Sequence, residues 1–191
     1  MILSQEDKKF IQDNIKEELT KLALKTHKTN SSMGFLLTQV QSRQKAIKKL
    51  PTWVGNKEVV FYSKLSTEQC SSEITANYKA ELVSGNSLLD LCSGFGVDDV
   101  FFSKKVKEVT ALELNADLVE QVSHNHKVLG CNNICVLSES AEDYLSQTKE
   151  KFDWIYLDPA RRDEANKKLV SFEECSPNVL TLDLFHYTDN V

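Results

Sequence analysis

The chain has 191 residues, of which 41% are hydrophobic and 27% charged, and its formal net charge is −5. This length and composition are typical of a soluble globular protein with one domain and a small appendage. No apolar run reaches the ~20 residues that span a bilayer, and the first residues lack the pattern of a signal peptide. Five cysteines without a Cys-x-x-Cys pair predict reduced thiols in a cytoplasmic protein and argue against a structural metal site.

The charge is unevenly distributed along the chain. Residues 1–57 contain 11 Lys and Arg against 5 Asp and Glu, whereas residues 58–191 contain 12 against 23. A basic front of this kind can dock nucleic acid through one face. A solvated helical surface explains the same pattern equally well, so charge alone leaves both interpretations open.

The first third of the chain predicts a small helical lobe, residues 1–62. A helix over residues 4–25 begins at a capping-box-like Ser4 and Asp7 and places Phe10, Ile11 and Leu22 on one face. A second helix spans Met33 to Lys49, and Pro51 marks its end. The segment Trp53–Tyr62 reads as a connector or a short strand.

Residues 63–191 predict a second unit of the α/β class. After a third helix from Thr67 to Val83, apolar strands alternate with amphipathic helices. This alternation predicts a parallel sheet with right-handed crossovers. The expected strands lie near residues 87–91, 109–113, 134–137, 153–157 and 179–183, and the expected helices near 97–105, 116–129, 141–147 and 163–173.

Two turns that follow strands carry the functional signal. The first is Asp90-Leu-Cys-Ser-Gly94-Phe-Gly96, in which the two glycines let the backbone pass close under a ligand. Asp90, at the strand end, is placed either to pin the turn or to pair with the ammonium group of the ligand. It lacks the Gly-x-Gly-x-x-Gly spacing of dinucleotide enzymes. Since S-adenosylmethionine (SAM) has no pyrophosphate to bind, this favours SAM over NAD. Glu113, at the end of the next strand, can accept hydrogen bonds from a ribose diol, although a solvated acid is the alternative.

The second turn is Asp158-Pro159-Ala160-Arg161-Arg162. Proline fixes its backbone, and Asp158 can orient a nucleophile or take its proton. The arginines suit a phosphate or a carboxylate. The alternative is a purely structural turn with a local ion pair.

Together these segments resemble the class I SAM-dependent methyltransferases, which have a Rossmann-like parallel sheet. A closer likeness covers residues 60–183 through Glu68–Lys79, Gly94–Asp98 and Asp158–Arg162. These stretches resemble bacterial methyltransferases with a THUMP-like C-terminal domain. That likeness implies an RNA substrate.

The resemblance also implies roles for further residues. Gln69, Thr75 and Lys79 would line the cofactor pocket, and Asp98 would either favour its helix dipole or face the sulfonium. Ser140 and Ala141 stand where the family usually has an acid that contacts adenine, and Glu139 or Glu142 is the alternative for that contact. The two histidines at 124 and 126 are expected at the surface.

The second turn also separates methyltransferase classes. Ala160 and Arg161 replace the proline and aromatic residue that adenine-amino enzymes carry. Uracil-5 enzymes share Asp-Pro-Ala-Arg but need a cysteine after the fifth strand, and Val179–Asp183 contains none. The sequence therefore predicts direct methyl transfer without a covalent enzyme intermediate.

The number of expected strands is smaller than in a complete methyltransferase sheet. The methyltransferase sheet normally has seven strands, and this chain offers five, so the sheet is expected to be incomplete with an open edge. The alternative function is a SAM-binding or degenerate module that docks a partner, or a second copy, through that edge.

Overall fold

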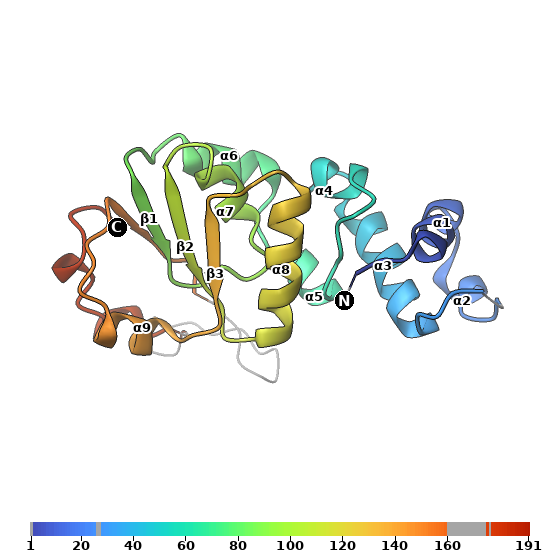
Figure 1. Ribbon diagram of the computed structural model, residues 1–191. Coiled ribbons are helices and arrows are strands. Elements are labelled where there is room, and N and C mark those ends of the chain that lie inside the picture. Colours follow the sequence, from blue (N-terminus) through green and yellow to red (C-terminus); the bar gives the residue numbers. More distant parts are fainter. Residues whose placement is uncertain (1, 26–27, 160–174, 176) are drawn as a thin grey trace.

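The protein has an α/β fold, seen in a computed structural model that describes residues 2–25, 28–159, 175 and 177–191 (Figure 1). Four parallel strands form the sheet, in the order β3-β2-β1-β4. Their bounds are Ser87–Asp90 for β1, Glu108–Leu112 for β2, Ile134–Leu137 for β3 and Trp154–Tyr156 for β4. The parallel α/β class is confirmed, and so are the first four predicted strands.

Helices cover both faces of the sheet (Figure 1). On one face, Leu88 of β1 packs with side chains of α6 (Glu73–Ala80) and α7 (Val97–Phe102). On the other face, Leu89 packs with α9 (Ala141–Gln147). Successive strand residues point to opposite faces, so both layers bury apolar side chains of a single strand. The crossover from β2 to β3 is α8 (Ala116–Val128).

Two of the predicted long helices are each divided in two. The segment expected to be one helix over 4–25 forms α1 (Gln5–Asn14) and α2 (Leu19–Leu22). The amide of Gln44 donates hydrogen bonds to the carbonyls of Ile15 and Glu17, which satisfies the end of α1 and lets the chain turn.

The helix expected from Thr67 to Val83 is likewise divided into α5 (Lys64–Gln69) and α6. Ser72 caps the second half by accepting a hydrogen bond from the backbone N–H of Thr75 at 3.0 Å. The helix predicted from Met33 forms as α3 (Met33–Ala46), and Pro51 then begins the short α4 (Pro51–Gly55).

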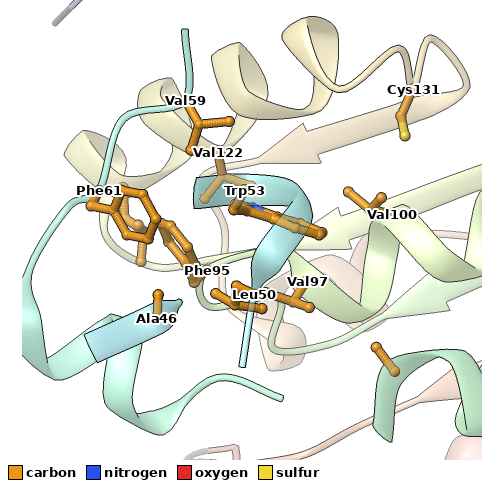
Figure 2. Close-up of a cluster of buried hydrophobic side chains, with 12 residues drawn as sticks. Ala46, Leu50, Trp53, Val59, Phe61, Phe95, Val97, Val100, Val122 and Cys131 are labelled. Atoms are coloured by element: carbon orange, nitrogen blue, oxygen red, sulfur yellow. The ribbon is translucent and has the colours of Figure 1, made fainter. Parts of the chain in front are cut away.

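The helical N-terminal part shares a hydrophobic cluster with the glycine loop and the helices beside the sheet (Figure 2). Trp53 of α4 and Phe61 are completely or almost completely buried, and the Phe61 ring lies 5.5 Å from that of Phe95 in the loop after β1. Val122 of α8 belongs to the same cluster. The division into residues 1–62 and 63–191 stays a prediction, and packing joins the two parts closely.

The predicted fifth strand over residues 179–183 is wrong. Val179–Thr181 instead forms a short 3-10 helix, η2, followed by η3 (Leu184–His186). Beyond η3 the chain runs beside β4, where Phe152 N–H donates to the Tyr187 carbonyl and Ile155 N–H to the Asn190 carbonyl, both at 2.9 Å. These bonds cover the edge that the sequence left open. The helix expected at 163–173 lies outside the described residues.

Within the described ranges, the helices are too short or too polar to cross a membrane.

Candidate functional site

The candidate site lies at the carboxyl edge of the sheet, between β1 and β4. The strand order reverses there, and crevices at such switch points are where open α/β sheets bind ligands. Two segments meet at this point: the glycine loop, Leu91–Gly96, and the β4 turn, Leu157–Pro159. The backbone N–H of Asp158 donates to Cys92 Sγ at 3.0 Å, and that of Leu91 donates to the Tyr156 carbonyl at 3.0 Å. The two segments predicted from sequence are therefore in contact.

The two glycines of the loop have different surroundings. Both have positive φ, +56° at Gly94 and +70° at Gly96. A Cβ at Gly96 would lie 2.5 Å from His126 Nε2 and 2.6 Å from Val122 Cγ1, so this glycine permits close packing on α8. A Cβ at Gly94 would meet nothing nearer than the Cys92 carbonyl at 4.0 Å. Gly94 is therefore the glycine with open space above it.

Two buried acids lie beneath the glycine loop. Asp90 and Asp99 are at most 1% exposed, and their carboxyl groups are hydrogen-bonded to each other. Burial and the nearby charge of Asp99 raise the pKa of Asp90 well above its usual range. Burial also raises the pKa of Asp99, opposed by His126 and by a hydrogen bond from Ser93. The pKa is raised for both acids, so the pair keeps a proton where ordinary carboxyl groups would lose it. Asp90 Oδ1 accepts the Cys92 N–H at 2.8 Å.

Glu113 follows β2 at the same edge. Its Oε1 accepts the backbone N–H of Asn115 at 2.8 Å. Burial raises the pKa of Glu113, while hydrogen bonds from the backbone N–H groups of Asn115 and Gly94 act in the opposite direction. The end of β2 is tied to the glycine loop at the preceding residue, where the Ser93 N–H donates to the Leu112 carbonyl at 2.9 Å.

A polar cluster joins α6, α7 and β4 beside the glycine loop. Lys79 Nζ donates to Ser71 Oγ at 2.9 Å and to Asp98 Oδ2 at 3.2 Å, and it also bonds the Tyr156 hydroxyl. Lys79 Nζ also lies 3.6 Å from Asp158 Oδ2, within ion-pair distance. Burial, followed by the charges of Asp98 and Asp158, raises the pKa of Tyr156, so its hydroxyl stays neutral. Asp98 Oδ1 is buried without a hydrogen-bond partner.

The remaining predicted site residues are less closely connected. Gln69 and Thr75 are exposed, and the Thr75 hydroxyl bonds Ser72 within the cap of α6. Ser140 caps α9 and donates to Asp143 Oδ2 at 2.7 Å, and Ala141 packs in the core. Pro159 is partly buried, whereas Arg161 lies outside the described residues.

Sequence reasoning missed several members of the site. The expectation that His126 lies at the surface is wrong: it is 2% exposed, and its Nε2 lies 3.1 Å from the Gly96 carbonyl and 3.9 Å from Asp99 Oδ2. Tyr156 and Ser71 were also missed, because a strand tyrosine and a loop serine carry no motif. The Asp98-Asp99 doublet at a helix start was the available signal for Asp99. Among the residues that the structure describes, no group of His, Cys, Asp and Glu could hold a metal ion.

The sequence and the fold of this chain match known proteins. Residues 68–181, more than half of the chain, match the family model described as conserved hypothetical protein 95. The chain belongs to this family. The fold of this family member is that of a methyltransferase: it aligns with the crystal structure of a candidate methyltransferase from Porphyromonas gingivalis W83 with a TM-score of 0.76 and 23% identity, over 98% of this chain and 48% of the other. The expected class I methyltransferase fold is thus confirmed.

Curated relatives of this family member carry RNA methyltransferase names. An uncharacterized RNA methyltransferase of Mycoplasma mobile is 34% identical over 45% of this chain and 24% of its own length. The 23S rRNA (uracil(1939)-C(5))-methyltransferase of Vibrio vulnificus is 31% identical over 52% of this chain and 26% of its own length. A Listeria innocua relative, also named as an uncharacterized RNA methyltransferase, is 25% identical over 87% and 40%. The chain thus spans well under half the length of each of these relatives.

Proposed function

We propose that this chain is the catalytic core of a SAM-dependent methyltransferase that acts on RNA in the cytoplasm. The observation that carries the proposal is the junction of three strand ends. The glycine loop is hydrogen-bonded to the β4 turn through Cys92 and Asp158, and to the end of β2 through the Ser93 N–H and the Leu112 carbonyl, next to Glu113. Methyl transfer requires a cofactor segment and an acceptor segment side by side, and this junction supplies both.

The residues at this edge fit SAM. The open space above Gly94 admits a ligand close to the backbone, and the partly exposed Asp98 carboxylate supplies a negative charge that would face a cationic group. Glu113 would accept hydrogen bonds from the ribose diol. Asp90 and Gly96 would hold the loop in shape, while Gln69, Thr75, Ser140 and Ala141 would border the cofactor more loosely. When bound, SAM supplies an electrophilic methyl group.

The β4 turn would hold the acceptor. The Asp158 carboxylate, which is exposed enough to be reached, would accept the proton that the acceptor atom loses when it is methylated. Pro159 would fix the turn, and Arg161 would pair with a phosphate of the RNA. The excess of basic residues over 1–57 supports an RNA partner.

Direct displacement is the mechanism we favour. The Vibrio vulnificus relative is named for uracil-C5 methylation, a reaction that needs a cysteine nucleophile. The cysteine that follows β4 along the sequence is Cys175, which is 7% exposed. Cys175→Ser should leave methyl transfer within ~3-fold of wild type, whereas a loss of ~100-fold or more would indicate the uracil-5 mechanism.

The decisive test is calorimetric titration with S-adenosylhomocysteine. We expect binding, weakened at least ~10-fold by Glu113→Ala, because the charge-assisted bonds to the ribose diol are lost. Glu108→Ala is the matched control, since Glu108 is an exposed acid at the opposite end of β2. Absence of binding, or equal loss in both variants, would overturn the cofactor assignment.

Transfer of radioactive methyl groups from SAM to total RNA tests the second half of the proposal. Binding without transfer would favour the degenerate module that docks a partner. Light scattering then measures whether the chain pairs with itself, and a partner at the edge of β4 would have to displace Tyr187 and Asn190.

A further inference from the structure

We propose that Lys79 is a positioning residue that fixes the β4 turn against the glycine loop, and that it does not bind the cofactor. This inference rests on the proposed methyl transfer. It concerns the relative placement of the two segments, and the sequence motifs assign no residue to that task. Lys79 is the residue whose side chain contacts the start of α7, the end of β4 and the β4 turn together.

The N–H donors of Lys79 are all used within the protein. An ammonium group has three N–H donors. The three hydrogen-bond partners found here are Ser71 Oγ, Asp98 Oδ2 and the Tyr156 hydroxyl. No donor is left over for a cofactor carboxylate, so the ammonium group is committed to the protein.

The two carboxylates near Lys79 differ in their exposure to water. The side chain of Lys79 is 24% exposed and that of Asp98 14%, so this ion pair is partly shielded from water. The side chain of Asp158 is 55% exposed, and its carboxylate approaches Lys79 at ion-pair distance without a hydrogen bond. Lys79 is thus fixed on the Asp98 side and acts on Asp158 as an anchored positive charge.

Asp158 attaches the β4 turn to the rest of the protein at two points. Among the described contacts of Asp158, the backbone is tied to Cys92 Sγ and the side chain is tied to Lys79. A thiol sulfur is a weak acceptor, so the bond to Cys92 alone restrains the turn poorly. The lysine supplies the second attachment, and with it the orientation of the carboxylate that faces the acceptor.

The consequence is a specific division between binding and turnover. Because a displacement of about 1 Å between reacting groups can cost ~100-fold in rate, loss of Lys79 should lower kcat. We expect Lys79→Met to lower kcat for methyl transfer to total RNA by ~10–100-fold. Affinity for S-adenosylhomocysteine and KM for SAM should change less than ~3-fold.

Three further variants sharpen the test. Lys79→Arg, which keeps the positive charge, should restore kcat to within ~5-fold of wild type. Tyr156→Phe removes one contact of Lys79 but leaves its pairing with Asp158, so its kcat should fall less than that of Lys79→Met. Lys105→Met is the matched control, because it breaks a lysine–carboxylate pair of 2.9 Å with Glu81 outside the cluster. A ~10-fold or greater loss of S-adenosylhomocysteine affinity in Lys79→Met would overturn the proposal in favour of a cofactor ligand.

Amide hydrogen exchange provides a readout that does not need activity. In Lys79→Met the N–H of Asp158 should exchange at least ~5-fold faster than in wild type, while the amides of β1 are unchanged, because only the turn is released. Unchanged exchange at Asp158 would overturn the positioning role even if activity fell. If no variant methylates RNA, the proposed function fails for this chain, and the exchange result still decides the role of Lys79.

Discussion

At the scale of single residues, Gly94 and Gly96 share a left-handed backbone but serve different purposes. Each has a positive φ, a backbone conformation that costs residues other than glycine about 1–2 kcal/mol. Of these two glycines, only Gly96 has neighbours that would clash with an added Cβ. One glycine thus permits packing, and the other leaves room for a ligand.

This difference gives a paired prediction. Gly96→Ala should lower the free energy of unfolding by roughly 3 kcal/mol, because overpacking against His126 and Val122 adds to the backbone strain. Gly94→Ala should cost only about 1 kcal/mol but weaken S-adenosylhomocysteine binding at least ~10-fold. Urea denaturation and calorimetry measure the two effects. Equal losses of stability in both variants would contradict this assignment.

Asp90 makes stability depend on pH. Its pKa in the folded chain is well above the ordinary 3.8, so above about pH 4 the folded state keeps a proton that the unfolded state has released. The free energy of unfolding therefore falls as the pH rises from about 4 through the raised pKa of Asp90. Acids whose pKa is lowered, such as Asp7, have the opposite effect: the stability that they contribute to the folded chain is lost as the pH falls.

Asp90→Asn should remove part of this decline, since the amide is neutral and its oxygen can still accept the Cys92 N–H. The measurement is the free energy of unfolding of both proteins between about pH 5 and pH 8. The variant should gain stability over wild type as the pH increases. Parallel curves would show that the raised pKa of Asp90 does not cause the decline in stability.

At the scale of elements, side-chain amides hold an extended segment that belongs to no sheet. The backbone of Val60 exchanges two hydrogen bonds of 2.8 Å with the Asn125 side chain, and Gln39 does the same for Phe61 at 2.7 and 3.0 Å. Each amide thus replaces a neighbouring strand, which satisfies the buried backbone beside Phe61. The sequence left this segment as a connector or strand because its partners are 22 and 65 residues away.

Loss of one of these amides should be costly. Asn125→Ala should lower the free energy of unfolding by roughly 3 kcal/mol, because it leaves a buried N–H and a buried carbonyl of Val60 without partners. His124→Ala is the matched control on the same helix, where a half-buried ring bonds the Glu58 carbonyl, and it should cost less than about 1 kcal/mol. Chemical denaturation separates the two, and equal costs would contradict the role of Asn125.

Elements that depend on local pattern were predicted well, and those that depend on distant contacts were not. The strands at β1 to β4 follow from short apolar runs between turns, and α7, α8 and α9 from the helical segments between them. The breaks in the first and third predicted helices depend on Gln44 and on Ser71 and Ser72, which act through tertiary contacts and capping. Periodicity alone continues through such breaks.

At the scale of the whole molecule, the C-terminal segment completes the second face of the sheet. Leu184 is 5% exposed and packs in a cluster with Leu89 and Ile155, and the Tyr187 hydroxyl donates to the Leu145 carbonyl at 2.6 Å. Residues predicted to form a fifth strand thus lead into a cover for the fourth. The chain itself therefore covers the edge of β4.

Leu184 should therefore matter more than its neighbour. Leu184→Ala should lower the free energy of unfolding by about 3 kcal/mol through loss of a buried side chain. Phe185→Ala, at a side chain that is 76% exposed, should change it by less than ~0.5 kcal/mol. Thermal unfolding and light scattering measure stability and association, and a Phe185 effect as large as that of Leu184 would mean that the segment packs differently.

The sequence by itself determined the parallel α/β architecture, the glycine loop and the acids at the strand ends, because these depend on the order of neighbouring residues. Only the tertiary structure decided that Gly96 packs on His126, that burial beside Asp99 raises the pKa of Asp90, and that Lys79 joins Asp98 to Asp158. It also decided that the C-terminal residues take the place expected for a fifth strand. Each of these depends on side chains or backbone groups far apart in the chain, whose contacts no local pattern encodes.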